Sequence, residues 1–315
     1  MAAEYSLFDL HCDTALKLFT ERSSLRCNDT CHISLKKAAY LKKYAQIFAI
    51  FTERSRSNYE GYASFIDAVA YFNNELKKNS DIVSPICKTS NDIKNAICTG
   101  KAVALLSIED ARILDGNLKR TDKIFDLGVR LVTPVWSGVS CIGGAHDTNV
   151  GLTEFGKKAV TKMIEKGIIL DISHSSEATA SEIMDIAQSA SRPVIATHSN
   201  AYSVHPHSRN LRDTQFYRLK SSGGLVGISL CPFHLAASNA NIDDIIKHID
   251  KYMELGGDKN IALGADLDGT ELPKGFNGVS DIYKIADKLL SLGYSTELTE
   301  RIFFKNAYEF MLKNL

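Results

Sequence analysis

Short apolar segments rich in β-branched residues recur along the chain and alternate with longer stretches whose apolar residues follow a helical period. Eight segments of the first kind can be counted in the 315 residues. They cover residues 7–11, 45–51, 103–109, 129–135, 168–174, 193–198, 225–230 and 261–266. This alternation is typical of parallel strands joined by helices. We therefore expect an α/β fold built on a parallel sheet.

Helical patterns fill most of the intervals between these segments. They cover residues 59–78, 154–166, 177–189, 214–221, 242–255 and 279–292. Gly167 and the pair Gly256-Gly257 follow two of these stretches, where glycine commonly ends a helix. Eight strand–helix repeats predict closure into a (β/α)8 TIM barrel, and the length suits one barrel domain over residues 1–315. Periodicity alone leaves an open doubly wound sheet as the alternative.

Charge and cysteine content exclude several classes of protein. Lysine plus arginine and aspartate plus glutamate each total 37, so no strong field would attract nucleic acid or an anionic membrane. The seven cysteines include no CxxC pair, which argues against a disulfide framework and favours a reducing compartment. We find neither a signal-peptide pattern at the amino end nor an apolar stretch of membrane-spanning length. We expect a cytoplasmic protein.

Metal-binding residue types stand at the ends of five predicted strands. In a (β/α)8 barrel the active site is assembled at the carboxyl ends of the strands. The residues concerned are His11, Asp13, Glu109, His174, His198 and Asp266. Each has an ordinary alternative when taken alone, such as a surface turn, a solvated carboxylate or a buried histidine. Three imidazoles together with carboxylates favour zinc over magnesium or calcium, which prefer oxygen ligands.

The local sequence supports several of these positions. His11 and Asp13 are two residues apart, so in an extended segment both side chains point to one face. Glu109 ends an apolar run, where an ionised carboxylate requires a partner or a cation. His174 and His198 stand in Ser-His-Ser and Thr-His-Ser, whose hydroxyls can orient a ligand histidine.

Seven segments carry a resemblance to a known family. They are DLHCDT (9–14), SIEDA (107–111), GLTEFGKKAV (151–160), LDISHSS (170–176), PVIATHSNAYSV (193–204), HSRNL (207–211) and GADLDG (264–269). In the same order and over nearly the whole chain, the sequence resembles the membrane (renal) dipeptidase family, peptidase family M19.

The resemblance implies two zinc ions per chain, bridged by Glu109 and by a water or hydroxide. His11, Asp13 and Glu109 would hold one ion. Glu109 would hold the other together with the two remaining ligand residues, which are His174 and His198. The bridging hydroxide would attack the peptide carbonyl.

Four further residues are candidates for the reaction or for the substrate. The resemblance implies that Asp266 is the acid/base and that Arg209 binds the terminal carboxylate of a dipeptide, a role suited to a planar two-pronged donor. Asn210 and Trp136 are the other candidate substrate contacts. Many family members carry a histidine where this chain has Trp136, and tryptophan cannot exchange a proton. We interpret His146 as an exposed loop residue. The alternative is that His146 takes the place of the histidine that many family members have at the position of Trp136.

The predicted function is zinc-dependent hydrolysis of L-L and L-D dipeptides. One alternative is another amidohydrolase-type activity on N-acyl amino acids or lactones, of which only the former would need Arg209. Another is a metal-stabilised barrel that binds a small ligand without cleaving it, although such a module would not need Asp266. Family members are often dimers, so the resemblance leaves a homodimer open.

Overall fold

The strands form one parallel sheet in a computed structural model that describes residues 5–52 and 57–315. They are β1 (Ser6–Cys12), β2 (Lys43–Phe51), β3 (Val83–Ile86), β4 (Ala102–Glu109), β5 (Val129–Thr133), β6 (Ile169–Leu170), β7 (Val226–Ile228) and β8 (Ile261–Leu263). Their order is β6-β5-β4-β2-β1-β8-β7, and β3 pairs with β4 outside this path. All the expected strand segments except one are therefore strands, and β3 is an addition.

Residues 193–198, the exception, close the sheet into a barrel. Ile195 forms a parallel bridge to Asp171 beyond β6, and Ala196 forms one to Val226 in β7. On the β6 side the backbone pairing ends there, because the amide of Thr197 donates to the side chain of Asp171, at 2.9 Å, instead of to a backbone carbonyl. The bridges connect β6 to β7, so the predicted barrel fold is confirmed.

Two glycines let this closing segment approach its neighbours. A Cβ atom at Gly227 would lie 1.9 Å from the carbonyl oxygen of Thr197, and one at Gly264 would lie 1.7 Å from the same oxygen. Neither distance is sterically possible, so both positions require glycine. The residue before His198 is thereby held against β7 and β8.

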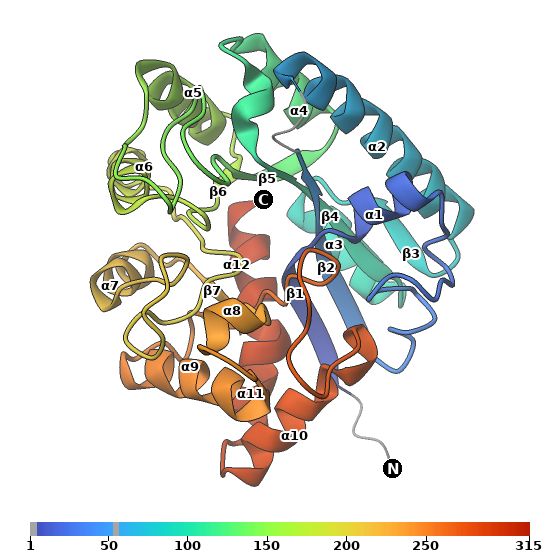
Figure 1. Ribbon diagram of the computed structural model, residues 1–315. Coiled ribbons are helices and arrows are strands. Elements are labelled where there is room, and N and C mark those ends of the chain that lie inside the picture. Colours follow the sequence, from blue (N-terminus) through green and yellow to red (C-terminus); the bar gives the residue numbers. More distant parts are fainter. Residues whose placement is uncertain (1–4, 53–56) are drawn as a thin grey trace.

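Helices surround the sheet (Figure 1). They are α1 (Thr14–Glu21), α2 (Asn58–Lys78), α3 (Ser90–Cys98), α4 (Lys119–Asp126), α5 (Glu154–Glu165), α6 (Glu177–Ser189), α7 (Asp213–Ser221), α8 (Pro232–Leu235), α9 (Ile242–Glu254), α10 (Tyr283–Ser291), α11 (Thr296–Glu300) and α12 (Asn306–Asn314). Five predicted helices match α2, α5, α6, α7 and α9 within one residue. The sixth, over 279–292, begins as a 3-10 turn and continues as α10.

Side-chain caps fix the start of the helices that follow the site-bearing segments. The hydroxyl of Ser176 accepts from the amide of Thr179 at the start of α6, at 2.9 Å. The hydroxyl of Thr153 accepts from Gly156 in the same way at the start of α5, at 2.9 Å. Such caps satisfy amides that have no partner within the helix.

Two apolar layers hold the barrel together. One lies between the strands and the surrounding helices. The other fills the barrel with alternate residues of the strands, including Phe8, Leu10, Val103 and Leu105, and extends onto one face of α12. In Figure 1 this last helix lies across the centre of the ring. Over residues 5–52 and 57–315, no helix combines the length and apolar character needed to cross a bilayer.

Candidate metal centre and active site

Six of the predicted site residues meet at the carboxyl ends of the barrel strands. We call them the strand-end group. It comprises His11, Asp13, Glu109, His174, His198 and Asp266. Their side chains form three overlapping sets of three in which potential ligand atoms lie within 4.8 Å of one another. The barrel has thus brought together residues that are up to 255 positions apart in the sequence.

His11 and Asp13 lie at the end of β1. The Nε2 atom of His11 is 3.6 Å from Oδ2 of Asp13. The pairing of β1 with β2 shifts register between Asp9 and Cys12, and Asp13 is already the residue before α1. The two side chains therefore share a site as predicted, although simple strand alternation does not describe the backbone between them.

Glu109 stands at the centre of the group. It follows Val103, Leu105 and Ser107 on alternate positions of β4, and the first two of these side chains fill the barrel interior. Alternation therefore turns Glu109 into the barrel mouth. Its carboxylate oxygens lie 3.6 Å from Nε2 of His11 and 2.9 Å from Nε2 of His174. The carboxylate is placed to bridge two ligand sets.

The two remaining histidines face one another through their Nε2 atoms, 2.9 Å apart. The Nδ1 atom of His174 lies 3.1 Å from the carbonyl oxygen of Trp136, so it must carry the proton. The Nδ1 atom of His198 lies 2.8 Å from the hydroxyl of Thr197. That hydroxyl donates to the carboxylate of Asp171 at 2.5 Å, so it accepts from His198. Both Nε2 atoms are thus left with lone pairs that converge on one point.

Asp171 and Thr197 were not among the predicted site residues, yet they orient the ligands. Asp171 is fully buried and also accepts from the hydroxyl of Thr133, at 2.6 Å. A carboxylate that fixes a ligand histidine through a hydroxyl resembles the supporting contacts found around protein metal sites. The sequence LDISHSS placed Asp171 near the site, but only the fold shows what it contacts.

Burial and mutual charge set the protonation of the group. Burial disfavours charge on His11, but the neighbouring Glu109 and Asp13 outweigh it and raise the pKa of His11 well above its ordinary value. Burial and the charge of Arg209 lower the pKa of His174 to about 4, and burial lowers that of His198 well below its ordinary value. The pair of histidines is therefore neutral near pH 7, which is the state that binds metal.

Asp266 faces the group from the end of β8. Its Oδ1 atom lies 3.9 Å from Nε2 of His11, and its side chain borders an open cavity. Its backbone is left-handed, with a φ of 59°, as is that of His174, with a φ of 68°. Such angles are uncommon for residues with side chains and occur often at functional sites.

The space above the group is a cavity of about 590 Å³, which we call the central cavity. It is bordered by Glu109, His174 and Asp266 from the strand-end group and by Trp136. The indole packs against Phe51, with ring centroids 4.7 Å apart, and lies 6.0 Å from the His174 ring. The predicted contact residue Trp136 thus borders the site as an apolar wall.

Four basic side chains border the central cavity from loops and from the short helix α8, and we call them the loop group. They are His146, His207, Arg209 and His234. His146 was interpreted as an exposed loop residue, and the structure places it at the cavity together with His207. Nothing in their local sequence distinguished them, because their position depends on how the loops fold over the mouth.

Arg209 is the most buried member of the loop group, with 5% of its surface exposed. Its Nε and Nη2 atoms have no hydrogen-bond partner within the described part of the chain. Burial lowers the pKa of the guanidinium, while Glu109 and Asp266 oppose this. The adjacent Asn210 donates to the carbonyl oxygens of His205 and His234, each at 2.8 Å, and so holds the loop in place.

The donor atoms of the strand-end group fit a metal ion. Within residues 5–52 and 57–315, Nε2 of His11, Oδ1 of Asp13 and Oε1 of Glu109 are buried and lack a hydrogen-bond partner. A buried polar atom without a partner costs about 1–3 kcal/mol, more if charged. Lone pairs and carboxylates that converge in this way are stabilised by a shared cation. The residue types match mixed nitrogen and oxygen coordination.

Comparison with known proteins agrees with this geometry. The model of the membrane dipeptidase family, peptidase family M19, matches residues 1–313. The chain belongs to this family. The protein is therefore a metallo-hydrolase of a dipeptidase family, and the resemblance read from the seven segments is confirmed.

Two curated proteins are similar to the chain in sequence. An uncharacterised dipeptidase of Schizosaccharomyces pombe is 29% identical over 291 residues, which cover 86% of this chain and 68% of that protein. A Klebsiella pneumoniae protein from the pqqA 5′ region is 30% identical over 244 residues, which cover 73% of this chain and 88% of that protein.

Solved structures share the fold. A family M19 metallopeptidase, the dipeptidase AC, has a TM-score of 0.92 at 22% identity, with 99% of each chain covered. A metallopeptidase from Rhodobacter sphaeroides, liganded with a phosphinate mimic of the dipeptide L-Ala-D-Ala, has a TM-score of 0.91 at 21% identity. That likeness covers 99% of this chain and 100% of the other.

Proposed function

We propose that the protein is a two-zinc dipeptidase that cleaves L-L and L-D dipeptides with a free terminal carboxylate. One observation carries the proposal. Two ligand sets that share Glu109 lie beside Arg209, whose guanidinium is buried and has unpartnered N–H groups among the described residues. A catalytic centre and a carboxylate receptor therefore border the same cavity.

The strand-end group divides into two ligand sets. His11, Asp13 and Glu109 form one set. Glu109, His174 and His198 form the other. Zinc suits both sets, because imidazole nitrogens and carboxylate oxygens are its common ligands. Bound zinc ions would supply a water molecule of lowered pKa near neutral pH and polarise the scissile carbonyl group.

Arg209 orients the substrate in this proposal. A planar guanidinium donates two parallel hydrogen bonds to a carboxylate, which fixes direction as well as position. The unpartnered Nε and Nη2 atoms form one edge of that group and are available for such a pair. A dipeptide held by its carboxylate has its peptide bond one residue away, which directs that bond toward the strand-end group.

Asp266 transfers the proton. Its carboxylate borders the central cavity beside His11, 3.9 Å from Nε2 of that residue, and makes no hydrogen bond to another described side chain. It takes a proton from the attacking water and returns it to the leaving amine. The relative from Rhodobacter sphaeroides that holds a mimic of L-Ala-D-Ala supports the inclusion of L-D substrates.

Elemental analysis of the purified protein, together with a panel of L-L and L-D dipeptides, tests the proposal. We expect about two zinc ions per chain, and cleavage that chelators abolish and added zinc restores. Zinc without cleavage of any dipeptide would contradict the proposed substrate class. A chain that binds no divalent metal would contradict the proposal as a whole.

The variant Asp266→Asn tests the proton transfer separately. Asparagine has nearly the same shape but cannot accept a proton, so kcat should fall by about 100-fold to 10,000-fold, the usual contribution of general acid–base catalysis. Zinc content should stay that of the unaltered protein, because Asp266 belongs to neither ligand set proposed here. Unchanged turnover in this variant would remove Asp266 from the mechanism.

A further inference from the structure

A second cavity, also of about 590 Å³, adjoins the central cavity, and we call it the lateral cavity. The two share His146, His174 and Arg209 as lining residues. The shared wall thus contains both a ligand histidine and the buried guanidinium. A substrate carboxylate held by Arg209 would lie where the two cavities meet.

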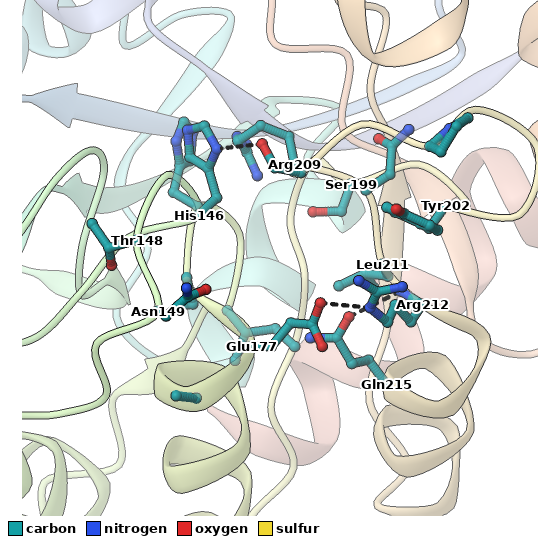
Figure 2. A pocket seen from close by; sticks show the side chains of 17 residues that line it. His146, Thr148, Asn149, Glu177, Ser199, Tyr202, Arg209, Leu211, Arg212 and Gln215 are labelled. Atoms are coloured by element: carbon teal, nitrogen blue, oxygen red, sulfur yellow. Dashed lines mark hydrogen bonds and ion pairs between the residues drawn. The ribbon is translucent and has the colours of Figure 1, made fainter.

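The lateral cavity has a polar wall. Figure 2 shows Asn149 on one side, Tyr202 and Arg212 on the other, and Glu177 and Gln215 below them. A cavity of this volume is within the range of about 300–1,000 Å³ that is common for small-molecule sites. Polar groups placed in such a site determine which ligand is accepted.

Most of the charge in this wall is already neutralised. Nε of Arg212 lies 2.5 Å from a carboxylate oxygen of Glu177, so these two residues form an ion pair. Arg209 remains as the cationic group and is committed to the substrate carboxylate. The Nδ1 atom of His146 lies 2.9 Å from the hydroxyl of Ser208, so this ring takes part in a hydrogen bond at the cavity. The rest of the cavity therefore offers hydrogen bonds and little net charge.

The central cavity contrasts with this wall. Its lining includes four apolar or aromatic side chains, those of Leu16, Phe51, Trp136 and Phe233, among its polar residues. Because the two cavities meet at Arg209, the two residues of a dipeptide on either side of the scissile bond encounter different surroundings. The residue that carries the free carboxylate is the one nearer the lateral cavity.

We propose that the lateral cavity receives the side chain of the carboxyl-terminal residue, and that the enzyme prefers an uncharged polar side chain there. This inference rests on the proposed dipeptidase function and specifies its substrate class. A glutamine side chain can exchange hydrogen bonds with the cavity wall, whereas methionine of similar length would leave those polar groups without partners.

Paired substrates and a cavity-filling variant test this assignment. The substrates share one amino-terminal residue and end in glycine, glutamine or methionine. We expect KM for the glutamine dipeptide to be about tenfold below that for the methionine dipeptide, equivalent to one additional net hydrogen bond. The variant Ala178→Phe places a ring at the lateral cavity from the first turn of α6. It should raise KM about tenfold for the glutamine dipeptide. For the glycine dipeptide, KM should change by less than about twofold.

Two further variants keep the test decisive. Ala190→Phe makes the same change at the exposed end of α6 and should leave every KM unchanged. Asn149→Phe fills the cavity from an exposed loop on the opposite wall and should reproduce Ala178→Phe even if that variant folds poorly.

The possible outcomes separate this inference from the function on which it rests. Two outcomes would overturn this inference and leave the proposed function standing. One is equal KM values for the glutamine and methionine dipeptides. The other is that both cavity-filling variants affect the glycine and glutamine dipeptides equally. Absence of cleavage of all three dipeptides by the zinc-loaded unaltered enzyme would overturn the proposed function and this inference together.

Discussion

The strand-end group and the loop group border the same cavity but are held in different ways. His11, Glu109 and His198 lie at strand ends, and each has 3% or less of its surface exposed. His146 and His207 come from loops and His234 from the short helix α8, and all three are only partly buried. The first group depends on the closure of the barrel, whereas the second depends on a few side-chain contacts between loops.

This difference separates chemistry from selection of the substrate. Side chains at the ends of paired strands are fixed by the hydrogen bonds of the sheet, which suits ligands that must converge within a few tenths of an ångström. Loop segments over a rigid scaffold can vary without loss of that geometry. We infer that the strand-end group performs the reaction and that the loop group determines what is cleaved.

Removal of the bridging charge should have the largest effect. In Glu109→Gln an amide of nearly the same shape replaces the carboxylate that contacts His11 and His174, so both ligand sets lose their shared anion. We expect kcat/KM to fall by about 1,000-fold or more, equivalent to about 4 kcal/mol, and zinc content to fall with it. Elemental analysis and dipeptide kinetics measure both.

If excess zinc restores the activity of Glu109→Gln, the prediction is refined. That result would show that the variant binds zinc more weakly but still catalyses the reaction once zinc is bound. Full zinc content and full activity in the variant would contradict the bridging role. Far-ultraviolet circular dichroism is the control for folding.

Truncation of the buried guanidinium should have the next largest effect. Arg209→Ala should lower kcat/KM for dipeptides by about 100-fold, because removal of a buried charged partner costs about 2–5 kcal/mol. Zinc content should be unchanged, since Arg209 is in neither ligand set. Arg209→Lys keeps the charge but loses the paired donors and should recover only part of the loss.

The same variant distinguishes substrate classes. An N-acyl amino acid has the terminal carboxylate and should lose cleavage with Arg209→Ala, as dipeptides do, whereas a neutral lactone should be cleaved as before. Dipeptide kinetics that do not respond to Arg209→Ala would show that the loop group does not select the substrate.

A smaller effect should follow from loss of the hydroxyl that orients His198. Thr197→Val keeps the shape of the side chain but leaves Nδ1 of His198 without its acceptor. We expect zinc affinity to fall by about 10-fold to 100-fold, the usual effect of removing such a supporting contact. Competition with a chromophoric chelator measures the affinity.

Thr133→Val is the matched control. The hydroxyl of Thr133 donates to the same carboxylate, Asp171, at 2.6 Å, but contacts no ligand histidine. Its zinc affinity should remain close to that of the unaltered protein. Equal losses in the two variants would show that Asp171 alone, and not the chain through Thr197, supports the site.

The two groups also differ in how far the sequence predicted them. Glu109 was predicted from its place at the end of an apolar run, and the structure adds that the regular alternation of β4 turns its side chain into the barrel mouth. The pair His11 and Asp13 was predicted for a simpler reason than the structure shows, since the register shifts between Asp9 and Cys12. The pattern of a strand is local in the sequence, so the residues at the strand ends could be predicted from it.

The other features of the site could be located only from the folded structure. The segment 193–198 reads as a strand, but Asp171 accepts from the amide of Thr197 and ends the backbone pairing on the β6 side, a contact between positions 26 residues apart. His146 and His207 have no period and reach the cavity only through the path of their loops. Arg209 was identified through the resemblance, because a single arginine in a loop carries no signal of its own.

The last predicted effect concerns stability and its dependence on pH, at the contacts that hold the loop group in place. His248 in α9 is fully buried, accepts from the amide of Ala201 at 3.1 Å and lies 3.0 Å from the carbonyl oxygen of Leu235. These contacts join the segments that carry Arg209 and His234. Burial lowers the pKa of His248 to about 4, opposed by the Leu235 carbonyl and Asp244 and reinforced by His205 and Lys247.

The sign of the effect follows from this pKa. Between pH 6.5 and about 4 the unfolded chain binds a proton at His248 that the folded protein does not. This residue should therefore remove up to about 3 kcal/mol from the free energy of unfolding as the pH falls through that range. His248→Gln, which cannot be protonated, should show a shallower decline in denaturant unfolding measured from pH 7 to pH 4. Identical slopes for the two proteins would mean that His248 does not make the free energy of unfolding depend on pH. The contrast between the strand-end group and the loop group would then rest on Arg209 and Glu109 alone.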